Sequence, residues 1–91
     1  MKESIIAGGD SKYCFICNRI ATDRHHCLHG SYRKLADEDG LTVNLCRECH
    51  QILHDKGIND KSLQMTAQMS WEKHYGSRED FMKRYGRSFI L

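Results

Sequence analysis

Side chains that can bind metal or transfer protons are concentrated in two short stretches of this 91-residue chain. The stretch DRHHCLHG places His25 and His26 side by side, and CRECHQILH places His50 and His54 four residues apart. Residues four apart in a helix share one face, so His50 and His54 can hold one metal ion together. Adjacent residues in a strand point to opposite faces, so we expect His25 and His26 to have different roles.

We predict that His25 completes a three-histidine metal site with His50 and His54, and that His26 acts as a base beside that metal. Three protein ligands with open positions are typical of a catalytic site. An imidazole with an ordinary pKa of about 6.5 suits proton abstraction at neutral pH. Imidazole ligands favour Zn²⁺, Ni²⁺ or Co²⁺, and Mg²⁺ or Mn²⁺ stay open as the metal used in cells. The alternatives are a second structural zinc and a histidine cluster without activity or metal.

Four of the five cysteines form two C-x-x-C pairs, Cys14 with Cys17 and Cys46 with Cys49. Two thiolates at this spacing bind one tetrahedral metal, and two such pairs complete a four-cysteine Zn²⁺ site with no open position. The alternative is two reduced pairs or a redox motif, but a redox C-x-x-C accompanies a βαβ pattern that this sequence lacks. Cys27 is left over, and we expect it to be a small buried hydrophobe.

A small α+β domain is predicted to position these residues. DRHHCL alternates as a strand does, LTVNLC (residues 41–46) is its predicted partner, and the second cysteine pair opens a helix that continues to Gly57. A zinc knuckle joined by a hairpin to a helix N-terminus is the treble-clef arrangement. We expect a flexible leader over residues 1–12, a zinc-stapled metal core over 13–56, and a helical extension packed on the core over 57–91.

The extension is predicted to contain two helices. One runs from about residue 60 to 75 and carries an apolar stripe at helical spacing, which indicates core packing. The other follows SRED (residues 77–80), a variant of the capping box, and ends at Gly86. Three apolar side chains of this second helix are expected to face inward: Phe81, Met82 and Tyr85.

The segment HHCLHG…LTVNLCRECHQILH, flanked by the C-x-x-C pairs, resembles the HNH (His-Asn-His) endonucleases of the ββα-metal type that carry a four-cysteine zinc. The resemblance covers about residues 14–54. RKLADEDGLTV and EDFMKRYGRSFIL are similar to small HNH-type proteins encoded by bacteriophages and prophages. The resemblance implies that His25, His50 and His54 are metal ligands, that His26 is the general base, and that the substrate is DNA.

The family pattern includes a middle Asn, and the nearest Asn in this chain lies at a different distance from the helix histidine. The position about nine residues before the helix histidine is held by Leu41, whereas Asn44 lies only six residues before His50. Asn44 is predicted either to orient the loop that carries His26, as a catalytic-site residue, or to be an ordinary strand residue.

Composition and charge bound the partners and the location. The formal net charge of +2 permits nucleic-acid binding but does not argue for it. No apolar run approaches the roughly 20 residues needed to span a membrane, so no membrane association is expected. The odd number of cysteines argues against a closed set of disulfides. We therefore expect a reducing, cytoplasmic location, and the resemblance implies a bacterial cell, with a phage as one source of the gene.

Two basic clusters are candidates for phosphate contacts, each with a solvated surface as its alternative. The first follows the histidine pair and comprises Tyr32, Arg33 and Lys34. The second lies in the extension and comprises Lys73, Arg78, Lys83, Arg84 and Arg87.

The sequence therefore predicts a metal-dependent HNH endonuclease that hydrolyses DNA phosphodiester bonds, with one structural Zn²⁺ and one catalytic divalent metal. The alternative is a non-catalytic zinc-binding treble-clef module that binds DNA or a phage or host protein, as a recombination or packaging accessory.

Overall fold

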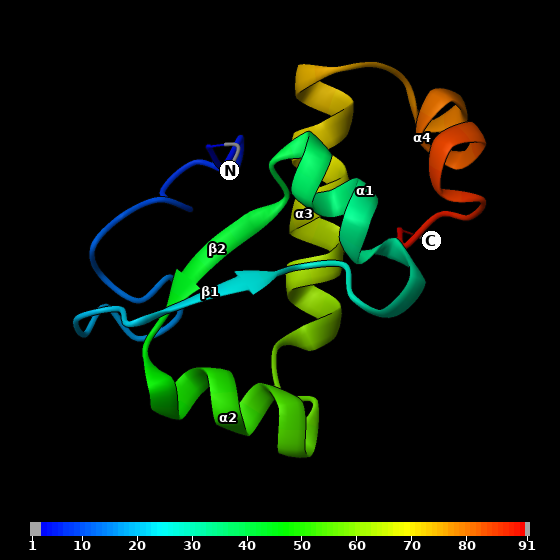
Figure 1. Cartoon of the computed structure of the whole chain (residues 1–91). Helices are drawn as coiled ribbons and strands as arrows, with labels where there is room; N and C mark the ends of the chain where they lie inside the picture. The colour runs from blue at the N-terminus through cyan, green and yellow to red at the C-terminus, as the bar shows by residue number, and fades with distance from the viewer. Residues whose placement is uncertain (1–2, 91) are drawn as a thin grey trace.

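The chain folds around a short antiparallel hairpin (Figure 1). The computed structural model describes residues 3–90 and shows a small α+β fold with a two-stranded sheet and four α-helices. Helix α2 lies across one end of the hairpin, and α4 lies at the other side of the molecule. The elements in chain order are β1 (Asp23–His26), a 3-10 turn η1 (Gly30–Tyr32), α1 (Arg33–Asp39), β2 (Thr42–Leu45), α2 (Arg47–Lys56), α3 (Asp60–His74) and α4 (Arg78–Tyr85).

The register of the hairpin separates the two neighbouring histidines. Arg24 lies opposite Asn44, and His26 lies opposite Thr42. Residues two apart in a strand share a face, so Arg24 and His26 lie on one face of the hairpin. His25 therefore points to the other face. The predicted division of the pair between two faces is confirmed.

Helix α2 begins and ends where the sequence predicts. Cys46 caps its N-terminus in an extended conformation, and the Cys46 sulfur accepts a hydrogen bond from the backbone N–H of Cys49. The helix stops at Gly57, which has a left-handed φ of +70° and donates its N–H to the Leu53 carbonyl oxygen. The helix thus presents two cysteines at its start and His50 on its first turns.

The N-terminal segment differs from the expected loose leader. Ile6 is buried, and the backbone N–H of Ile5 donates to the Gly40 carbonyl oxygen over 2.9 Å. Further on, the carbonyl oxygen of Gly9 accepts from the N–H of Asn44 in β2 over 2.8 Å. Residues 3–12 therefore pack along β2, because their short apolar segment is buried in the core and their backbone groups form hydrogen bonds with the hairpin region.

The helical extension packs on the core through the predicted stripe of α3, whose members Leu63, Ala67 and Trp71 are all buried. In α4, Phe81 and Tyr85 are buried as predicted, but the prediction for Met82 is wrong, since Met82 is 45% exposed. Consecutive residues in a helix are about 100° apart, and the four-residue spacing of the other two side chains defines the buried face. Across residues 3–90, no helix has the length and apolarity to cross a membrane.

The carboxylate of Asp39 ties the extension to the core. It is buried and accepts hydrogen bonds from the indole N–H of Trp71 (2.8 Å) and the hydroxyl of Tyr85 (2.7 Å). The guanidinium of Arg84 donates to both carboxylate oxygens, at 2.6 and 2.8 Å. The last residue of α1 therefore satisfies polar groups from both α3 and α4.

Asp39→Ala is expected to destabilise the protein by about 3 to 5 kcal/mol, because the N–H of Trp71 and the hydroxyl of Tyr85 stay buried without an acceptor. The measurement is urea unfolding. Glu38→Ala is the matched control, since Glu38 is exposed and also contacts Arg84, at 3.2 Å; its cost is expected to be at most about 1 kcal/mol. Equal losses in the two variants would contradict the structural role of Asp39.

Candidate functional site

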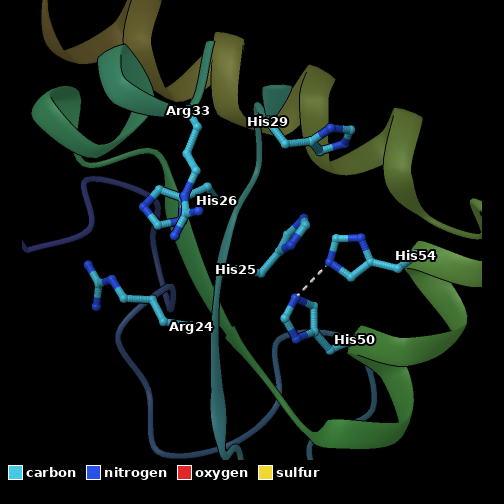
Figure 2. A pocket seen from close by; sticks show the side chains of 7 residues that line it. All are labelled: Arg24, His25, His26, His29, Arg33, His50 and His54. Atoms are coloured by element: carbon cyan, nitrogen blue, oxygen red, sulfur yellow. Dashed lines mark hydrogen bonds between the residues drawn. The ribbon is translucent and has the colours of Figure 1, made fainter. Parts of the chain in front are cut away.

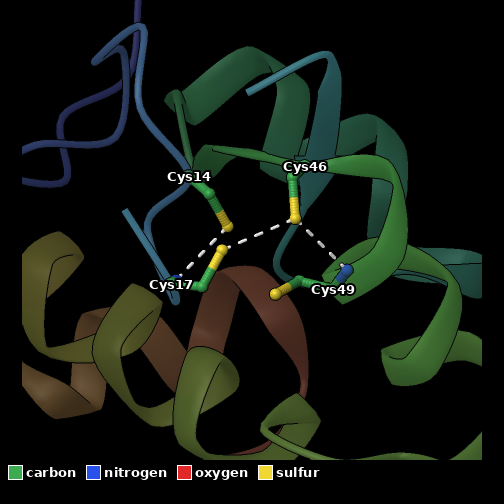
Figure 3. Close-up of side chains that lie close together, drawn as sticks. All are labelled: Cys14, Cys17, Cys46 and Cys49. Atoms are coloured by element: carbon green, nitrogen blue, oxygen red, sulfur yellow. Dashed lines mark hydrogen bonds between the residues drawn. The ribbon is translucent and has the colours of Figure 1, made fainter. Parts of the chain in front are cut away.

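Four cysteines from two distant segments meet at one point (Figure 3). The sulfur atoms of Cys14, Cys17, Cys46 and Cys49 all lie within 4.8 Å of one another. The sulfurs of Cys17 and Cys46 are 3.6 Å apart, and all four thiols are free. Two sulfurs on a tetrahedral Zn²⁺ with bonds of about 2.3 Å lie about 3.8 Å apart. The predicted clustering is confirmed, and its geometry is compatible with a zinc site.

Both cysteine pairs sit in similarly hydrogen-bonded turns. The backbone N–H of Cys17 donates to the sulfur of Cys14, as the N–H of Cys49 donates to that of Cys46, over 3.5 and 3.4 Å. The first turn is completed by Asn18 at a φ of +66°, a conformation that Asn tolerates better than most residues. Each turn therefore directs two sulfurs to the same side.

The ionisation of the thiols also favours a cation among them. The guanidinium of Arg19 donates to the sulfur of Cys17 over 3.4 Å and lowers the pKa of that thiol to about 6. Burial beside the other sulfurs raises the pKa of Cys49 to about 12. A divalent cation removes the penalty of ionising all four, since thiolates are the form that binds metal. Cys27 lies outside the cluster, and burial raises its pKa to about 12, as befits the predicted buried hydrophobe.

Three histidines from β1 and α2 form a second cluster, on the face of the hairpin that α2 covers (Figure 2). The candidate ligand atoms of His25, His50 and His54 lie within 4.8 Å of one another. The Nε2 atoms of His50 and His54 are 3.0 Å apart. Two imidazole nitrogens on a tetrahedral metal with bonds of about 2.05 Å lie about 3.3 Å apart. The predicted convergence of these three residues is thus present in the fold.

The strongest sign that the histidine cluster fits a metal comes from His25. Its side chain is 2% exposed, and its Nε2 atom is buried without a hydrogen-bond partner. A buried polar atom without a partner is costly, and a metal ion on Nε2 removes that cost. Burial lowers the pKa of His25 to about 4, so the imidazole is neutral at pH 7, which is the form that binds metal.

Asp23 supports this cluster and was not predicted from the sequence. Its Oδ2 lies 3.0 Å from Nδ1 of His50, and this hydrogen bond lowers the pKa of Asp23. A proton held on Nδ1 leaves Nε2 of His50 as the ligand atom. Strand alternation carries the signal, because Asp23 lies two residues before His25 and therefore on the same face.

Asp23→Ala is expected to weaken divalent metal binding at the histidine cluster about 10- to 100-fold, because His50 loses the carboxylate that orients its ring. The measurement is calorimetric titration of Co²⁺ into protein that already holds one Zn²⁺. Asp55→Ala, an exposed acid on α2, is the control and is expected to bind Co²⁺ within about twofold of wild type. Similar losses for the two variants would show that Asp23 acts only through its charge.

His26 lines the same pocket from the other face of the hairpin. Its Nε2 lies 3.0 Å from Oδ1 of Asp37, and this hydrogen bond lowers the pKa of Asp37. With the proton held on Nε2, Nδ1 of His26 keeps its lone pair and can accept a proton. The pocket has a volume of about 210 Å³ and is lined by Arg24, His25, His26, His29, Arg33, His50 and His54.

The side chain of Asn44 has a hydrogen-bond partner in the N-terminal segment. Its side-chain amide donates to the carbonyl oxygen of Ser11 over 3.0 Å, and it lies opposite Arg24 in the hairpin. The amide therefore anchors the N-terminal segment to β2. The partner that fixes the ring of His26 is Asp37, from α1.

The three residues of the basic cluster after the histidine pair do not lie together in the structure. Arg33 and Lys34 line hollows beside His26. The ring of Tyr32 instead packs against Phe89, with ring centroids 5.4 Å apart, because the C-terminal segment covers it. Tyr32 is therefore a packing residue.

Comparisons of the chain with protein-family models, with curated proteins and with solved structures found no match. The case for a function therefore rests on the geometry of the two clusters and of the pocket.

Proposed function

We propose that this protein is a metal-dependent endonuclease of the HNH type that hydrolyses DNA phosphodiester bonds. In this proposal the hairpin and α2 form a ββα-metal core, and the four cysteines hold a structural Zn²⁺ in a treble-clef arrangement. One observation carries the proposal: a three-histidine cluster with a buried, unpartnered Nε2 shares a pocket with a separate His26–Asp37 pair. A purely structural metal site would need no such neighbour.

In this proposal His25 and His26 have different roles because they lie on opposite faces of β1. His25, with His50 and His54, would hold a divalent cation. When bound there, a divalent cation would supply Lewis-acid stabilisation of the negative charge on the phosphate and the leaving oxygen. His26 is not among the residues whose ligand atoms converge, so its imidazole is available for proton transfer.

His26 acts as the general base. Nδ1 of His26 takes a proton from a water molecule, whose oxygen attacks phosphorus as the bond to the leaving oxygen breaks. Asp37 keeps the other ring proton on Nε2 and stabilises the imidazolium that forms. The leaving oxygen takes a proton from solvent and becomes a hydroxyl, the other strand end carries the phosphate, and His26 returns its proton to solvent.

The experiment that tests this proposal is cleavage of a supercoiled plasmid by the purified chain. Metal bound on purification is first counted, and Mg²⁺, Mn²⁺, Ni²⁺, Co²⁺ or Zn²⁺ is then added singly. The proposal predicts nicked and linear products with at least one metal and none in excess chelator. Folded, zinc-loaded protein that cleaves with none of these metals would contradict it. If that protein binds the plasmid, the non-catalytic DNA-binding module becomes the better account.

A further inference from the structure

A second, wider groove opens on the His26 side of the hairpin. Its volume is about 690 Å³, against about 210 Å³ for the pocket over the three histidines. The two hollows are adjacent, since Arg24, His26 and Arg33 line both of them. The wider groove is lined by Arg24, His26, Gly30, Arg33, Lys34 and Asp37.

The basic side chains that line this groove outnumber its carboxylates. Its one carboxylate, Asp37, is hydrogen-bonded to His26, and Arg24 pairs with Asp10 at 3.0 Å. Arg33 and Lys34 are exposed, and neither forms an ion pair with a carboxylate in the part of the chain that the structure describes. Two cations thus stand beside the pocket although the net charge of the whole chain is only +2.

In the other basic cluster, in the extension, three of the five cations are paired with carboxylates, whereas Lys73 and Arg87 form no ion pair in the part of the chain that the structure describes. Arg84 is held by the buried carboxylate of Asp39. Arg78 pairs with Glu72 at 3.1 Å, and Lys83 lies 3.8 Å from Glu79. No cation of the extension lines either hollow beside His26, whereas Arg33 and Lys34 do, so the predicted phosphate-binding role has better support in the groove.

We propose that the groove binds the DNA backbone that flanks the scissile phosphodiester, with Arg33 and Lys34 contacting two different phosphates. This proposal rests on the proposed function and adds the path of the substrate to it. Consecutive side chains in a helix point about 100° apart, so the two cations reach separate phosphates. Contacts to phosphates position the duplex without reading its sequence, so binding through this groove is independent of base sequence.

The test is binding of a fluorescein-labelled DNA duplex of about 20 base pairs, measured by fluorescence anisotropy without added divalent metal. The full chain is compared with the double variant Arg33→Gln/Lys34→Gln over a series of KCl concentrations. We expect the double variant to bind about tenfold more weakly at about 100 mM KCl. The slope of log Kd against log salt is expected to fall by about 1.8, which is the loss of two phosphate contacts.

The control Lys73→Gln/Lys83→Gln removes the same charge from the extension and is expected to bind within about twofold of wild type. Equal weakening by the two double variants, or wild-type binding by the groove variant, would overturn the proposed path. Because the binding measurement involves no cleavage, its result is independent of the cleavage test of the proposed function. If DNA binding depends on the groove but none of the metals supports cleavage, the proposed function alone is contradicted. If the protein cleaves DNA but binding does not depend on the groove, the proposed path of the DNA alone is contradicted.

Discussion

Cys46→Ser is expected to abolish the cooperative unfolding transition and to reduce bound zinc from one ion per chain to none. Cys46 is buried and serves both as the N-cap of α2 and as a member of the cysteine cluster. Zinc binding by such sites has an apparent free energy of about 10 to 16 kcal/mol, which matches or exceeds the whole stability of a small domain. The measurement is thermal unfolding followed by circular dichroism, with zinc counted by mass spectrometry.

Cys27→Ala is the matched control for this prediction. It removes a buried thiol outside the cluster and is expected to cost about 1 to 2 kcal/mol while zinc stays bound. A Cys46→Ser protein that melts within a few degrees of wild type would refute the structural role of the site.

His26→Ala is expected to lower the rate of plasmid cleavage about 100- to 10,000-fold, the range for loss of a general base. The fold and both metals are expected to remain, because the side chain of His26 contacts Asp37 and is not among the converging ligand atoms. The measurement is a cleavage time course at matched metal occupancy, with His74→Ala as control. His74 is exposed on α3 and does not line the pocket.

Two results would count against this assignment. A His26→Ala protein that cleaves within about twofold of wild type would show that the proton goes to another group. Loss of one metal ion in the same variant would show that His26 is a ligand, and the roles of His25 and His26 would have to be exchanged.

Both clusters of candidate metal ligands could be predicted from the sequence because their signals are local. Two residues between cysteines and three between histidines fix which side chains share a turn or a helix face, whatever the rest of the fold does. The place of His25 followed from strand alternation once β1 and β2 were paired. In each case only one long-range contact, the hairpin, had to be inferred.

The supporting carboxylates of α1 could not be predicted in the same way. Asp37 reaches His26 from α1, and Asp39 joins Trp71 and Tyr85 across 32 and 46 residues of sequence. Such contacts depend on the angle at which helices pack, and single acidic residues carry no periodic signal. The packing of residues 3–12 was missed for a related reason, since a few apolar residues without a repeat do not define an element.

The most direct test of the account is the rate of plasmid cleavage as a function of bound metal, from one to two ions per chain. Protein that holds one Zn²⁺ at the four cysteines is titrated with Co²⁺ or Mn²⁺. The account predicts no cleavage with the first ion alone, a rate that rises with the second, and saturation at two ions per chain. A full rate with one ion per chain, or no cleavage at any occupancy, would contradict the claim that the three-histidine cluster is the catalytic metal site.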